Sequence, residues 1–247
     1  MTADDSLLTA AIGATALLYA AVGQAGATGY LAWFALFGMD APMMKVSALA
    51  LNVVVAAIGT MQFARAGMVD WRSAAPFCVA GVPCAFLGGA LYLPGSIYGP
   101  VIGALLLLTA VQMVWQLLRK AGEVLPYRAP RLPPAVLSGA LVGFASGLTG
   151  AGGGIFLAPI LARLRWYEVR RAAGITATYN LVGSLAGLAG SLSTQGQFAP
   201  SLPVWAIAAA AGAVIGSTLG ARFLPPTVMR MILASILVIA GAKLISS

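Results

Sequence analysis

The stretch Gly147-Leu-Thr-Gly-Ala-Gly-Gly-Gly-Ile-Phe-Leu-Ala-Pro159 decides the fold of this chain. It places five glycines within the eight positions from Gly147 to Gly154, between two apolar segments, 136–146 and 155–164. A glycine-rich break leaves backbone N–H and C=O groups without helical partners, and hydrocarbon cannot satisfy them. Such a break persists in a membrane only where it is buried in protein or lines a cavity. We expect the helix to restart near Gly153, where its first N–H groups favour an anion.

The composition indicates an all-α polytopic membrane protein. Of the 247 residues, 60% are hydrophobic and 8% are charged, whereas soluble domains carry roughly a quarter charged residues. The net charge of +8 lies in short loops between apolar runs, a pattern typical of membrane topology rather than of nucleic-acid binding. There is no histidine, and the spacing of Cys78 and Cys84 fits no metal motif. We therefore expect no metal, no cofactor and no nucleic-acid partner.

Apolar runs divide the chain into two halves of the same layout. The first repeat, 1–118, contains a hairpin over 7–37 with its own polar, glycine-rich break (23–29), followed by three long spans. A polar linker, 119–133, joins the halves. The second repeat, 134–247, contains the hairpin 134–164 and three further spans. The six spans are predicted over residues 41–64, 71–93, 96–118, 168–190, 202–222 and 227–244.

Individual residues recur in the two halves at an offset that drifts from 125 to about 130, as an internal duplication with unequal loops would produce. Both breaks end with a glycine, and both third segments carry an asparagine near their centre. The corresponding pairs are Gly29 with Gly154, Asn52 with Asn180, Gly59 with Gly187, and Leu93-Pro94 with Leu224-Pro225.

The charges predict how the halves are oriented. If each glycine break is a hairpin whose arms return to the same side, each half has five segments and the repeats are inverted. Twelve basic residues then fall on one side, and only Lys45 and Lys243 on the other. The positive-inside rule makes the linker cytoplasmic and both termini extracytoplasmic, in a cell inner membrane. The twelve are Arg65, Arg72, Arg119, Lys120, Arg128, Arg131, Arg163, Arg165, Arg170, Arg171, Arg222 and Arg230.

The run Gly150-Ala-Gly-Gly-Gly-Ile-Phe-Leu-Ala-Pro159 resembles the signature of the TauE/SafE family of membrane anion transporters, often called sulfite exporters. The duplicated layout and the chain length are also similar to that family. The resemblance implies transport of sulfite, sulfonates or small carboxylates. The first-half copy, residues 26–34, lacks two of the glycines, and Phe34 stands where Pro159 does.

The candidate ligands are neutral hydrogen-bond donors. All six acidic residues lie at termini, loops or span ends, so the sequence indicates no proton relay within the membrane. Backbone N–H groups at the two breaks and mid-span side chains remain as donors for an anion. The asparagines have an alternative interpretation, in which they only hydrogen-bond a neighbouring helix. The predicted substrate-binding residues are Gln24, Thr28, Gly29, Asn52, Thr149, Gly152, Gly153, Gly154, Thr176 and Asn180.

We therefore predict a secondary transporter of a small organic or sulfur-containing anion, working by alternating access around two broken-helix hairpins. The expected partners are this anion and the lipid bilayer, and the sequence assigns no oligomer interface. A passive anion channel and a carrier of a small neutral metabolite share the architecture and remain alternatives. An intramembrane enzyme is not expected, because the chain has no histidine, no mid-membrane acid and cysteines in one span only.

Overall fold

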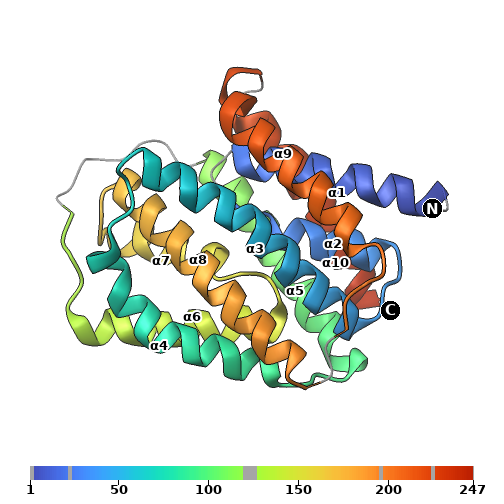
Figure 1. The fold of residues 1–247 in the computed structure, drawn as a ribbon, viewed down its shortest axis with the longest axis horizontal. Coiled ribbons are helices and arrows are strands. Elements are labelled where there is room, and N and C mark those ends of the chain that lie inside the picture. Colours follow the sequence, from blue (N-terminus) through green and yellow to red (C-terminus); the bar gives the residue numbers. More distant parts are fainter. Residues whose placement is uncertain (1–2, 22–23, 119–126, 195–196, 224–225, 247) are drawn as a thin grey trace.

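A computed structural model describes residues 3–21, 24–118, 127–194, 197–223 and 226–246. All regular secondary structure in these ranges is helical, which confirms the all-α prediction (Figure 1). The ten helices are α1 (Ala3–Ala21), α2 (Ala27–Leu36), α3 (Ala41–Arg65), α4 (Trp71–Ala90), α5 (Gly95–Leu118), α6 (Leu132–Thr149), α7 (Gly154–Leu164), α8 (Val169–Leu192), α9 (Leu202–Phe223) and α10 (Pro226–Ser246).

Five described helices are long and apolar enough to cross a membrane, namely those over 41–65, 71–90, 95–115, 132–149 and 227–246. The predicted polytopic membrane fold is confirmed. Residues 119–126 of the expected linker and the pair Leu224-Pro225 lie outside the described residues. The apolar segment 136–146, which precedes the second break, is part of a longer helix: α6 extends from Leu132 to Thr149, because prolines at its first positions initiate a helix.

Both predicted breaks are present, and glycine conformations produce them. Gly150 ends α6 with φ 79°, and Gly152 has φ 73°, values that L-residues with a side chain rarely adopt. Gly26, with φ 90°, precedes α2. The sequence places Thr28 and Gly29 inside the first break, but α2 already begins at Ala27, so both lie in its first turn.

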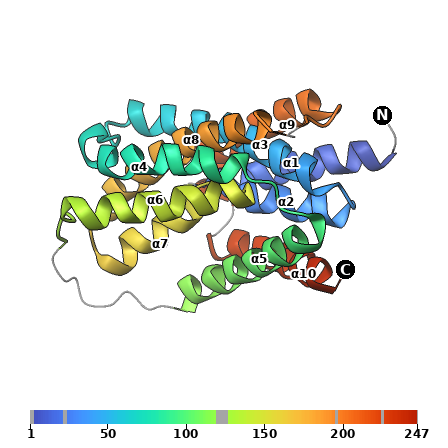
Figure 2. The same ribbon diagram turned by 90° about the horizontal axis from the view of Figure 1, so that it is seen from below.

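The first arm of each hairpin packs backbone to backbone against a helix of the other half (Figure 2). A Cβ atom on Gly143 would lie 2.9 Å from the Cα of Gly81 in α4. Gly139 and Gly147 make the same approach to α4, and Gly212 and Gly216 of α9 make it to α1. Glycines four residues apart thus permit close helix packing in both places. The packing of Gly220, in the same α9 series, is not among the described contacts.

The helix contacts are reciprocal between the halves. α6 packs on α4 as α1 packs on α9, while α3 contacts α8 and α5 contacts α10. α3 and α8 lie side by side through the middle of the molecule (Figure 1). This pattern supports the duplication, and the inverted orientation of the halves remains a prediction from the charges.

Buried apolar side chains form two clusters, which define two bodies. The larger body is built from α1, α2, α3, α5, α9 and α10, with Tyr30, Phe34 and Leu51 fully buried. The smaller body is built from α4, α6, α7 and α8 around Phe77 and Tyr179. The contact between α3 and α8 therefore lies where the two bodies meet.

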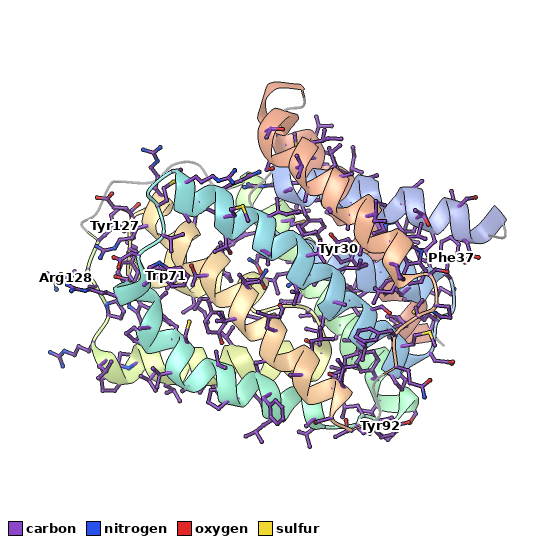
Figure 3. The ribbon with its side chains drawn as sticks, viewed as in Figure 1. Tyr30, Phe37, Trp71, Tyr92, Tyr127 and Arg128 are labelled. Carbon is purple, nitrogen blue, oxygen red and sulfur yellow. The ribbon has the colours of Figure 1, made fainter. Side chains whose placement is uncertain are left out.

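The molecule has two distinct ends. Both termini and Phe37 lie at one end, which we call the termini end; Trp71, Tyr127 and Arg128 lie at the other (Figures 1 and 3). At that other end, the Arg128 N–H donates to the carbonyl of Arg165, and Arg171 pairs with Asp70. We call it the arginine-rich end.

Replacing Gly143 with valine should destabilise the protein. A side chain there must push α6 away from the backbone of α4, and overpacking of this kind costs about 1–3 kcal/mol. Thermal unfolding in detergent measures the loss. Gly95→Ala is the control, because a Cβ at Gly95 meets no atom within 4 Å. Equal melting temperatures for the two variants would contradict this account of the α4–α6 contact.

Asp70 should contribute stability that depends on pH. Burial alone would raise its pKa, but hydrogen bonds from Ser73 and Arg171 outweigh this and hold the pKa below its ordinary value of 3.8. The contribution is therefore present above pH ~4 and is lost as the pH falls further. For this largely exposed pair we expect at most about 1 kcal/mol. A difference in melting temperature between wild type and Asp70→Asn that is unchanged from pH 6 to pH 3 would refute it.

Candidate functional site

A cavity of about 370 Å³ lies where the two bodies meet, bounded by both hairpins and by α3, α8 and α9. Its inner wall contains Asn52 and Asn180. From there the lining continues along α3 past Gln62 to Met68, in the connection to α4, so the cavity extends toward the arginine-rich end.

The two asparagines that correspond in the repeats hydrogen-bond each other. Asn52 on α3 donates from Nδ2 to Oδ1 of Asn180 on α8 at 3.2 Å, and to Oγ of Ser184 at 2.8 Å. Both are almost completely buried, with 1% and 6% of their surface exposed. The backbone N–H of Gly154, at the start of α7, donates to the same Asn180 oxygen at 3.0 Å. The amide pair thus joins α3, α8 and the second glycine break.

This network orients the Asn180 side chain. A backbone N–H can only donate, so the amide atom that faces Gly154 must be the oxygen. The NH₂ group of Asn180 then points away from Gly154, and Asn180 lines the cavity. Among the described hydrogen bonds this NH₂ group makes none.

The N-termini of two short helices also face the cavity. The lining includes Ala27 and Thr28 at the start of α2, and Gly154 and Ile155 at the start of α7. The residues that precede these helices, Gly26 and Gly153, have no side chain that could cap the first-turn N–H groups. The partial positive charge at both termini is therefore directed at one cavity, an arrangement that favours an anion.

Six of the ten predicted ligand residues line the cavity. Around its polar inner end, the Thr28 hydroxyl lies 2.9 Å from that of Tyr19, which is also part of the lining. Thr176 lies one turn before Asn180 on α8. The six are Gln24, Thr28, Asn52, Gly154, Thr176 and Asn180.

The other four, Gly29, Thr149, Gly152 and Gly153, lie outside the cavity lining. Three of them are glycines because a neighbour approaches closely. A Cβ on Gly29 would lie 2.9 Å from the ring of Tyr19, one on Gly153 2.8 Å from Tyr179, and one on Gly152 2.8 Å from Oδ1 of Asn180.

The Thr149 hydroxyl hydrogen-bonds backbone groups of nearby residues in the chain. Its hydroxyl donates to the carbonyl of Ala145 at 2.6 Å and accepts the N–H of Ala151 at 3.3 Å. Its carbonyl accepts the Tyr98 hydroxyl at 2.8 Å. Thr149 thus stabilises the turn of the second hairpin.

Sequence reasoning missed several polar residues of the site. Ser184 could have been found, because it lies four residues after Asn180 on the same helix face. Gln62 donates to the Ser217 hydroxyl at 2.6 Å, and both line the cavity. Ser217 follows the glycines of α9, where helix packing dominates the pattern. Tyr19 gives no signal in the sequence, since a tyrosine in an apolar run is usual.

The described lining residues are apolar, amide, hydroxyl or glycine residues, and none of those described carries a formal charge. Such a lining can bind and release a small solute through neutral donors. Buried neutral donors hold an anion without the strong desolvation penalty of a buried ion pair.

Long apolar helices, together with two broken-helix hairpins beside a cavity between two bodies, are typical of a membrane transport protein. The chain matches the family described as "Sulfite exporter TauE/SafE" over residues 7–244. It belongs to that family and is a membrane transporter.

Two relatives agree with this assignment. The chain is 45% identical over 231 residues to "Probable membrane transporter protein y4hK" of Sinorhizobium fredii, covering 93% of this chain and 94% of that one. It is 28% identical over 198 residues to "Probable membrane transporter protein MJ0441" of Methanocaldococcus jannaschii, covering 74% and 72%. No solved structure matches the chain significantly.

Replacing Asn180 with alanine should destabilise the fold more than replacing Ser184 does. The first change leaves both the Gly154 N–H and one Asn52 N–H without their acceptor, and the second leaves only one Asn52 N–H. A buried donor without a partner costs about 1–3 kcal/mol. Thermal unfolding in detergent without added anion tests the order. A larger loss for Ser184→Ala would overturn this description of the network.

Proposed function

We propose that this transporter carries a small organic or sulfur-containing anion, such as sulfite, a sulfonate or a carboxylate. The observation that carries the proposal is the convergence of the N-termini of α2 and α7 and of the Asn180 NH₂ group on one cavity. All of these groups are donors, and anions need donors. Gln24, Thr28 and Thr176 add polar side chains around the same volume. The family description supports sulfite as one candidate.

Alternating access would occur by movement of the two bodies against each other. The cavity extends toward the arginine-rich end, which the positive-inside rule makes cytoplasmic. At the termini end, the pocket between α3, the end of α4 and α8 measures about 30 Å³. This difference supports a conformation that faces the cytoplasm, in an inner membrane with both termini outside. Transport would require the bodies to part at the termini end and close at the other.

Two alternatives use the same cavity. A neutral metabolite could bind the uncharged lining, and a passive channel could use the same donors. A neutral carrier would show no competition among anions and no charge movement. A channel would show a flux that does not saturate. No enzymatic activity is proposed, because the described lining offers binding groups and no nucleophile paired with a base.

The Asn180→Ala variant should lose anion binding. Purified protein is screened in detergent for thermal shifts with sulfite, sulfate, thiosulfate, taurine, sulfoacetate and short carboxylates. A ligand of the folded state stabilises it by ~2.7 kcal/mol at a hundredfold excess over Kd. We expect at least a tenfold weaker Kd in Asn180→Ala, with each shift measured from the variant's own anion-free midpoint. Ser235→Ala is the control, because that exposed hydroxyl bonds only its own helical turn, at Met231.

Uptake or release of the stabilising anion by proteoliposomes completes the test. Saturable flux of this anion, weakened in Asn180→Ala and retained in Ser235→Ala, is the expected result. If none of the anions produces a thermal shift or a flux, the proposal is wrong. If Asn180→Ala binds the anion as tightly as wild type does, Asn180 contributes only to helix packing.

A further inference from the structure

Lys45 is a buried cation without an acidic partner among the described contacts. It lies in the second turn of α3, with 7% of its surface exposed. Its ammonium group donates to the carbonyls of Gly88 at 3.2 Å, Gly89 at 2.8 Å and Leu91 at 3.1 Å. All three of its N–H donors are thereby used, and all three acceptors are neutral. The positive charge is stabilised by the C-terminal end of α4 and is not cancelled.

These three hydrogen bonds join the two bodies at the termini end. α3 belongs to the larger apolar cluster and α4 to the smaller one. Ser191 of α8 donates to the same Gly89 carbonyl at 3.1 Å, so three helices meet at this point. The pocket of about 30 Å³ beside Lys45, roughly the volume of one water molecule, is lined also by Tyr92, Tyr98 and Thr194. In this conformation the contacts of Lys45 hold the termini end closed.

Lys45 also lies on the face of α3 that carries Asn52 of the candidate site. It precedes Asn52 by seven residues, which is two helical turns on the same face of α3 and ~10 Å along its axis. The second glycine break follows this face: Gly150 packs against Lys45, and Gly152 packs against Asn52. The backbone of one hairpin thus runs from the cation to the amide pair.

We propose, resting on the function proposed above, that Lys45 is the anion-binding residue at the extracytoplasmic side of the transport path. When the bodies part at the termini end, α3 separates from α4 and the ammonium group exchanges its carbonyl acceptors for the anion. When the bodies close again, the ammonium group donates to the three carbonyls as before, and the anion stays bound to the neutral donors around Asn180. The same charge favours anions over neutral solutes at the amide site even in the closed form. At ~10 Å and an effective dielectric constant of ~20, one unit charge is equivalent to roughly a tenfold to twentyfold change in affinity.

Three substitutions separate this role from that of a structural helix cap. Lys45→Arg keeps the charge, Lys45→Gln keeps a neutral donor for the carbonyls, and Lys45→Met removes both. The matched control is Lys243→Met, since Lys243 is the other lysine at the termini end and donates to the carbonyl of Leu36. Kd is measured in detergent for methanesulfonate, which is monovalent, and for sulfate, which is divalent.

We expect Gln and Met variants to bind methanesulfonate at least tenfold more weakly, and sulfate more weakly by about the square of that factor. Lys45→Arg and Lys243→Met should stay within about threefold of wild type. A Gln variant that binds like wild type, or equal losses for both anions, would overturn the proposal and leave Lys45 as a helix cap. If the Met variant does not fold, the Gln and Arg variants alone decide. Failure of wild type to bind any anion would instead reject the proposed function itself.

Discussion

Backbone N–H and C=O groups at a broken helix must find partners inside the bilayer, and the rest of this structure depends on how they do so. At the second break, the Gly154 N–H is taken by Asn180, and the Thr149 carbonyl by Tyr98. At the end of α4, Lys45 takes three carbonyls. Each partner comes from a different helix. The requirement therefore ties distant segments together.

Each of the two bodies contains helices from both halves of the duplicated chain. The first arm of each hairpin packs on a helix of the other half, through glycines that allow backbone contact. The larger cluster contains α1 with α9, and the smaller contains α6 with α4. Each hairpin consequently connects the two halves. The boundary between the bodies, where α3 contacts α8, therefore differs from the boundary between the repeats. Relative movement of the bodies would change the cavity without breaking either glycine-mediated contact.

In the transport path that we propose, the anion would be bound by two kinds of polar group along α3. Asn52 and its partner Asn180 present neutral groups in the middle of the protein, where a formal charge would be expensive. The cation stands two turns away, at Lys45, where the C-terminus of α4 offsets part of its desolvation. A site of this kind can attract an anion without holding it so strongly that release becomes slow.

The sequence by itself determined the helices, the two breaks, the membrane class, the family resemblance and the correspondence of Asn52 with Asn180 between the repeats. These follow from local rules: apolar length, glycine at positions of positive φ, and repetition at one offset. Only the tertiary structure decided which donors share a cavity. It placed Thr149 in a backbone turn and Gly152 behind the amide pair, and it brought Gln62, Ser184 and Ser217 to the site. Spacing along a helix says which residues share a face, whereas the direction of that face depends on how glycine-mediated contacts dock one helix onto another.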